Sequence, residues 1–239
     1  MNIPDQSELQ SVDNHGNRSS GVKPKIVYSI CITSFNTFRS VKTCLESILS
    51  QIDEKFEVIV VDNESTDGSL EILKEYEREK KLRLIVTPCS RGLGREIAVK
   101  RAHGDYIIVM DMDDVFEPKL ASLLELYHKS FEGLMVLAPG IPGVVITPKA
   151  LVEKLGGYRD LNWLEDADLY SRAAEINCFR LLKSFKILAY SIRDKRFAFH
   201  VTKYAKKNYL FFREAFRMSC GFSLRILLTS SRYDFIRIK

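Results

Sequence analysis

Short apolar runs alternate with amphipathic segments through the first half of the chain. Four runs rich in branched residues predict strands buried on both faces, over residues 26–32, 56–61, 82–86 and 105–110. Between them, apolar positions recur at helical spacing and predict helices over about 37–50, from 66 or 67 onward, and over 93–102. This alternation predicts an α/β fold with a mainly parallel central sheet and helices on both faces.

The alternation weakens further along, although short elements are still predicted. In chain order these are a helix that starts at 117–118, strands over 134–137 and 144–147, and helices over about 148–156 and 165–176. Residues 203–218 predict one more helix, with aromatic side chains on a broad side and lysines and arginines elsewhere. We therefore expect a C-terminal helical appendage on the α/β domain.

Composition divides the chain into three parts. Residues 1–24 are polar and predict a flexible leader, because they cannot bury an apolar face. Residues 25–192 hold the predicted α/β domain. Residues 193–239 form a basic, aromatic tail, with twelve Lys and Arg against three acidic residues. Such a tail either rests on an anionic surface, such as membrane phospholipids or a phosphorylated carrier, or packs as an ordinary helix on the domain.

Composition also narrows the class of protein. With 46% hydrophobic and 28% charged residues, the chain has ordinary globular composition. It has no run of about 18 apolar residues that would span a bilayer as a helix, and no export signal pattern at its start. The five cysteines form no CxxC pair, which favours reduced thiols over a zinc or disulfide framework. We expect a cytoplasmic protein, with the tail as a candidate peripheral contact to the inner face of the membrane.

Polar and acidic side chains follow three of the predicted strands. They occupy residues 33–36 (Thr-Ser-Phe-Asn), 62–65 (Asp-Asn-Glu-Ser) and 111–114 (Asp-Met-Asp-Asp). In an open parallel sheet, ligands bind beyond the carboxyl ends of the strands. Each stretch taken alone is also what a solvated turn would contain. Together they indicate a binding site at this edge of the sheet.

The Asp111-Met112-Asp113-Asp114 stretch is the candidate metal site. In extended backbone, residues two apart share a face and lie about 6 to 7 Å apart. One of Asp111 and Asp113 would then bind a divalent cation while the other reaches a ribose hydroxyl of the same ligand. Asp114 would point elsewhere unless the chain turns. One or two carboxylates together with substrate phosphates are typical of Mg²⁺ or Mn²⁺ sites.

The ordered set of motifs resembles a family 2 glycosyltransferase with the GT-A fold, a Rossmann-like arrangement. The resemblance runs from about residue 26 to 176 and follows the family's order throughout. The blocks that carry it are residues 30–36, 60–69, 91–95, 102–107, 111–114 and 165–169. The sequence departs from the family pattern at Glu96, where an asparagine is usual, and in a shortened loop before Arg95. The resemblance makes residues 25–192 the expected catalytic domain.

The resemblance implies roles for individual positions. A nucleotide-sugar donor is expected to lie against Thr33, Phe35, Asn36, Asp62 and Ser65, with Asp62 on the base. Arg95 is expected to face the ribose or the diphosphate. Asp111 is similar to the ribose-side carboxylate and Asp113 to the ligand of Mn²⁺ or Mg²⁺.

The resemblance also implies the chemistry. Asp166 is similar to the catalytic base, and a single displacement by a base-activated hydroxyl inverts the anomeric carbon. The alternative is that Glu165 and Asp166 are ordinary first-turn acids of a helix. His200 resembles a further metal ligand, although a lone histidine among apolar neighbours is more often structural. Trp163 either stacks against an acceptor sugar or belongs to the core.

These observations predict an inverting, metal-dependent transferase that moves a single sugar to a hydroxyl of a glycan or lipid-linked acceptor. The spanning helices and the Gln-Arg-Trp block of processive family members do not occur in the sequence. Two alternatives stay open, a sugar-phosphate nucleotidyltransferase and a non-catalytic scaffold or binding module. The first would need a glycine-rich phosphate loop after the first strand, and residues 33–36 are not one. No nucleic-acid partner is expected, because no recognised binding motif supports it.

Overall fold

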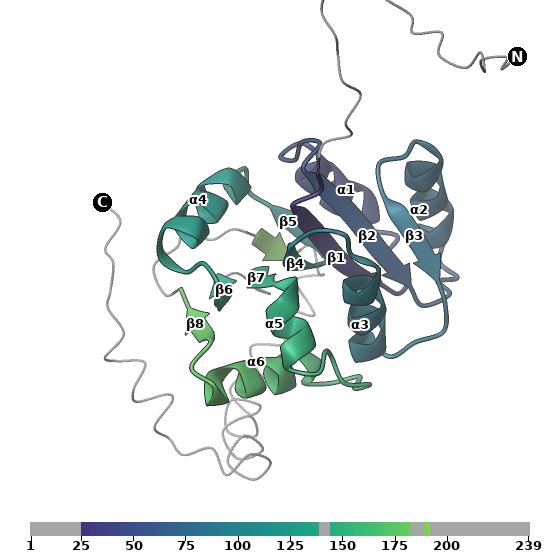
Figure 1. Ribbon diagram of the computed structural model, residues 1–239. Coiled ribbons are helices and arrows are strands. Elements are labelled where there is room, and N and C mark those ends of the chain that lie inside the picture. Colours follow the sequence, from purple (N-terminus) through teal and green to yellow (C-terminus); the bar gives the residue numbers. More distant parts are fainter. Residues whose placement is uncertain (1–24, 139–143, 183–188, 192–239) are drawn as a thin grey trace, which may run out of the picture.

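A computed structural model describes residues 25–138, 144–182 and 189–191. Within these ranges, seven strands form one central sheet in the order β3-β2-β1-β4-β7-β6-β8 (Figure 1). The expected leader (1–24) and tail (193–239) lie outside the described residues. No helix of the described part is long and apolar enough to cross a membrane.

The first four strands form the parallel part of the sheet. β1 (Tyr28–Ser34) pairs in parallel with β2 (Phe56–Asp62) on one side and with β4 (Tyr106–Asp111) on the other, and β3 (Arg83–Val86) extends the sheet beyond β2. The chain therefore reverses its strand order beside β1, which is where open α/β sheets bind ligands.

Three further strands complete the sheet. β7 (Val144–Pro148) lies antiparallel to both β4 and β6 (Met135–Ala138), and β6 pairs in parallel with β8 (Phe179–Leu181). Because β7 is the one strand of this sheet with reversed direction, the predicted mainly parallel sheet is confirmed.

Helices cover both faces of the sheet, as predicted. One core lies between the sheet and α1 (Val41–Leu49), α2 (Ser69–Arg78) and α4 (Leu120–Ser130). The other lies under α3 (Arg91–Arg101), α5 (Lys149–Lys154) and α6 (Glu165–Glu175). Successive strand residues alternate between the two cores, so both are buried and the strands read as continuous apolar runs.

The structure corrects several predicted boundaries. α1 starts after Ser40 rather than at Thr37, and α2 starts after Gly68 instead of Thr66 or Asp67. α3 begins two residues earlier than predicted, because the Ser90 hydroxyl accepts a hydrogen bond from the Leu93 amide (3.0 Å) and caps the helix ahead of its glycines. Three strands of three residues each were not predicted: β8 in the central sheet, and β5 (Asp114–Phe116) and β9 (Ala189–Ser191), which form a small antiparallel sheet.

Candidate functional site

The polar ends of three strands lie side by side at one edge of the sheet. In the strand register, Thr33 pairs with Asp111 and Ser34 pairs with Asp62. The structure therefore brings the three stretches that the sequence singled out to a single place. Thr33 is partly buried there, and 58% of Phe35 is exposed to solvent.

Three of the expected nucleotide-pocket residues form one hydrogen-bonded group. Asp62 is fully buried, and its two carboxylate oxygens accept from the amide (2.8 Å) and the hydroxyl (2.7 Å) of Ser65. The Ser65 hydroxyl accepts in turn from the Asn36 amide (2.9 Å). Asn36 has a positive φ of 53°, and its side-chain oxygen accepts from the Thr66 amide (2.9 Å). These bonds fix the loops after β1 and β2 against each other.

The acidic stretch after β4 folds into a turn, contrary to the extended backbone assumed from the sequence. Asp111 ends β4, the chain turns at Met112 and Asp113, and Asp114 begins β5. The buried Met112 side chain anchors the turn in the core. One carboxylate oxygen from each of Asp111, Asp113 and Asp114 lies within 4.8 Å of the others. Such a set of oxygens fits the ligand preference of Mg²⁺ or Mn²⁺.

A buried arginine connects this acidic turn to α6. The Nη2 atom of Arg95, on α3, lies 2.9 Å from Asp111 Oδ1 and 3.0 Å from Asp166 Oδ2. Its Nε atom lies 3.5 Å from Glu165 Oε1. Arg95 is only 3% exposed, so these carboxylates supply the counter-charge that a buried guanidinium needs.

Asp166 has the electrostatic character of a base that works near neutral pH. Burial raises the pKa of its carboxyl to about 6; the Arg95 charge lowers it, while the charges of Glu165 and Asp111 raise it further. At pH 7 most of the carboxyl is therefore ionised, yet its affinity for a proton exceeds that of an ordinary aspartate.

The segment before α6 is held against the start of α3. The Gly92 amide donates to the Leu161 carbonyl (2.8 Å), the Arg91 amide donates to the Asn162 side chain (3.3 Å), and the Ser90 hydroxyl donates to Asp160. Leu164 then enters α6 with a positive φ of 64°, a conformation that is strained for a leucine. We call residues 159–164 the α6 strap.

The structure excludes one of the two readings of Trp163 and places Glu96. Trp163 is 82% exposed, which excludes the core position considered from the sequence. The Glu96 carboxylate accepts from the Tyr158 amide (2.7 Å) and pairs with Lys100, so it holds the chain that leads into the strap. His200 lies outside the described residues, and its expected role as a metal ligand stays a prediction.

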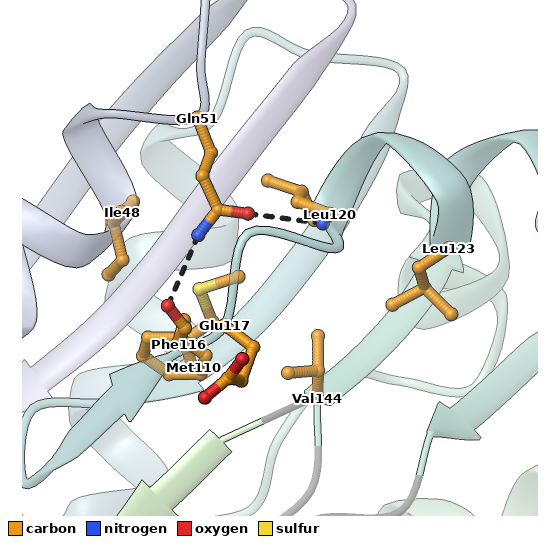
Figure 2. Close-up of a pocket in the computed structure, with 8 residues that line it drawn as sticks. All are labelled: Ile48, Gln51, Met110, Phe116, Glu117, Leu120, Leu123 and Val144. Atoms are coloured by element: carbon orange, nitrogen blue, oxygen red, sulfur yellow. Dashed lines mark hydrogen bonds between the residues drawn. The ribbon is translucent and has the colours of Figure 1, made fainter. Parts of the chain in front are cut away.

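A separate pocket lies on the α1 and α4 side of the sheet. Figure 2 shows the Gln51 side chain bridging the backbone of Phe116 (3.3 Å) and Leu120 (3.1 Å). The rest of the lining is mostly apolar, and none of the expected site residues belongs to it; it comprises Ile48, Met110, Phe116, Glu117, Leu120, Leu123 and Val144. Its two hydrogen bonds connect the segment after α1 to β5 and to the start of α4.

Comparisons with known proteins agree with this geometry. The family profile described as Glycosyl transferase family 2 matches residues 29–217. A poly(ribitol-phosphate) beta-glucosyltransferase of Bacillus spizizenii is 36% identical over 110 residues, which cover 44% of this chain and 17% of the relative. The first curated relatives are thus much longer than the region that this chain matches.

Solved structures share the fold. The crystal structure of TarS 1–349 from Staphylococcus aureus in complex with UDP has a TM-score of 0.58 at 21% identity, covering 69% of this chain and 60% of that chain. The mannosyltransferase PcManGT from Pyrobaculum calidifontis, in complex with GDP-Man and Mn²⁺, has a TM-score of 0.60 at 19% identity, covering 74% and 59%. These similarities confirm the expected GT-A fold class.

Proposed function

The chain belongs to glycosyl transferase family 2, and on this premise we propose that it moves a single sugar from a nucleotide-sugar donor to an acceptor hydroxyl. One observation carries the proposal: a single buried arginine joins an acidic turn, suited to a divalent cation, to a partly exposed carboxylate suited to proton removal. The two halves of an inverting transfer reaction need these two groups beside one another.

On the donor side, Asp113 together with Asp111 and Asp114 would hold Mn²⁺ or Mg²⁺. When bound, such a cation neutralises the negative charge that builds on a departing diphosphate. The loops fixed by Asp62, Ser65 and Asn36 would carry the nucleoside, with Thr33 and Phe35 beside it. The UDP of the TarS structure and the GDP-Man and Mn²⁺ of the mannosyltransferase structure support a nucleoside diphosphate donor.

On the acceptor side, Asp166 would take the proton of the attacking hydroxyl. The hydroxyl oxygen forms a bond to the anomeric carbon as the bond from that carbon to the diphosphate oxygen breaks. The proton ends on the Asp166 carboxylate, and the diphosphate leaves with the bonding electron pair. Attack from the face opposite the leaving group inverts the anomeric configuration.

The acceptor is proposed to be a glycan or a lipid-linked carrier. The similar proteins include a poly(ribitol-phosphate) beta-glucosyltransferase and a chondroitin synthase, whose names indicate polymer synthesis. The basic tail from residue 193 would then bring the enzyme to anionic lipid at the inner face of the membrane.

Radiolabelled UDP- and GDP-sugars, incubated with the protein and manganese, test the proposal. We expect slow release of the labelled sugar to water and loss of that release when the cation is chelated. Release of pyrophosphate from a sugar phosphate and a nucleotide would instead identify a nucleotidyltransferase. No turnover with any donor would favour a non-catalytic binding module.

A further inference from the structure

Arg95 is held by groups from two other elements of the fold. The arginine lies on α3, Asp111 ends β4, and Glu165 and Asp166 begin α6. Asp111 and Asp166 are 16 and 71 residues away from it in sequence, yet the same nitrogen atom, Nη2, contacts both carboxylates. One terminal nitrogen of a guanidinium carries two hydrogens, so it can serve both oxygens at once.

Two of the three guanidinium nitrogens face these carboxylates, Nη2 in hydrogen bonds and Nε in a longer ion pair. Arg95 is buried, and Nε faces the buried Glu165 at 3.5 Å. Asp166 depends on this contact, because its Oδ1 atom has no hydrogen-bond partner among the described residues. Its Oδ2 contact with Arg95 therefore sets how the carboxylate is turned.

We propose that Arg95 is a positioning residue, which orients the base Asp166 relative to the donor-side carboxylate Asp111 instead of contacting the donor diphosphate. This inference rests on the proposed function, since it assigns a task within that reaction. A planar fork with fixed donor directions suits the task, whereas the ammonium of lysine is a point charge on a flexible stem. A misplaced base raises the barrier to chemistry more than it weakens binding of the nucleotide.

Arg95→Lys tests the proposal because it keeps the charge and loses the fork. We expect kcat to fall about 10²-fold, with the affinity for UDP or GDP in the presence of Mn²⁺ falling less than about tenfold. A fall in nucleotide affinity as large as the fall in kcat would overturn the proposal, because a direct contact with the diphosphate would then explain it. An unchanged kcat would overturn it as well.

Arg172→Lys is the matched control. Arg172 is another mostly buried arginine; it holds Asp168 (2.6 Å) and the Gly157 carbonyl (2.8 Å) with the same nitrogen and fastens α6 to the same neighbourhood. We expect this variant to lower the melting temperature while kcat stays at the parent value. If Arg172→Lys lowered kcat as much as Arg95→Lys, the effect would be structural and the proposal would be wrong.

A double-mutant cycle separates action through Asp166 from direct action. Arg95→Lys is expected to lower kcat by less than about threefold once Asp166→Asn is already present, since the base that it positions is gone. If the two substitutions lowered kcat independently, so that their fold-losses multiplied, the proposal would be refuted. Should Arg95→Lys fail to fold, Asp166→Glu displaces the same contact from the other side, and parent-level kcat in that variant would refute it. If the parent protein bound no nucleotide and turned over no donor, the proposed function itself would fail first.

Discussion

Asp111 takes part in two contacts that concern different halves of the site. Its carboxylate lies within the acidic turn with Asp113 and Asp114, and it also accepts a hydrogen bond from Arg95. The turn at Met112 makes both possible, because it brings the following carboxylates back toward the end of β4. Because Asp111 is held by Arg95, a change there would disturb both halves of the site, so Asp113 is the more direct probe of cation binding.

Asp113→Ala should weaken binding of UDP or GDP with Mn²⁺ by at least about 10²-fold, because it removes a negative oxygen ligand. Isothermal titration calorimetry in the presence and absence of the cation measures the loss. Asp105→Ala is the control, since Asp105 lies before the opposite end of β4, where it pairs with Lys25. Unchanged affinity in Asp113→Ala would contradict the assignment.

The pH dependence of turnover should report Asp166. A base works in its ionised form, and burial raises the pKa of Asp166, the proposed base, to about 6. Below that value the carboxyl is protonated, so kcat/KM should fall by about tenfold per pH unit as the pH decreases. Steady-state rates measured across this range give the profile, and the residual activity of Asp166→Asn should lack this limb. A profile without a fall toward acid would assign the proton transfer to another group.

At the scale of elements, the approach of α3 to its neighbours determines the site. A Cβ atom on Gly94 would lie 2.9 Å from the Thr33 side chain, and one on Gly92 would overlap the backbone of the α6 strap. These glycines let α3 lie close enough to place Arg95 between β4 and α6. Glycine within a helix normally lowers stability relative to alanine. At these two positions it is used because any larger side chain would clash with the neighbouring segments.

Gly92→Ala should destabilise the fold by about 3 kcal/mol, because the added methyl group meets the strap backbone and neither segment yields easily. Urea unfolding followed by circular dichroism measures the change. Gly133→Ala provides the comparison: that position faces open space, and its positive φ of 84° alone should cost about 1 kcal/mol. Equal losses in the two variants would show that the strap is not packed against α3.

A sequence reveals local elements more readily than it reveals contacts between residues far apart in the chain. The runs that became β1, β2 and β4 were predictable, since each is an apolar stretch with a polar end. The contact between Arg95 and Asp166 was not, because it joins residues 71 positions apart through the packing of α3 on α6. The turn at Met112 was missed for a different reason. Alternating aspartates favour an extended reading, and the turn at Met112 and Asp113 that brings the three carboxylates together has no local signal in the sequence.

At the scale of the whole molecule, the two cores support one shared edge. Helices on both faces hold β1, β2 and β4 in register, so the loops that follow them lie at fixed distances. A ligand that bridges these loops gains affinity from a site already arranged, and binding in turn stabilises the fold by mass action.

The nucleotide should therefore raise the thermal stability of the full chain. UDP or GDP with Mn²⁺ at about 100 times Kd should add about 2.7 kcal/mol, which corresponds to a rise in melting temperature of about 5 to 10 °C. Differential scanning fluorimetry across nucleotides shows which base is preferred. The same nucleotides without cation, and Asp113→Ala with cation, should give little shift. If the nucleotide raised the melting temperature equally with and without the cation, the acidic turn would not be the cation site.

The α6 strap has a consequence for how such an enzyme could change its acceptor. Its backbone is tied to the first turn of α3, while Trp163 projects from it into solvent only three residues before Asp166. Exposed side chains of the strap, such as Trp163, can thus be exchanged without breaking its backbone contact with α3, and Asp166 stays in place behind it. Substitutions on this short exposed segment could change which acceptor hydroxyl is recognised, while the residues proposed for catalysis stay the same.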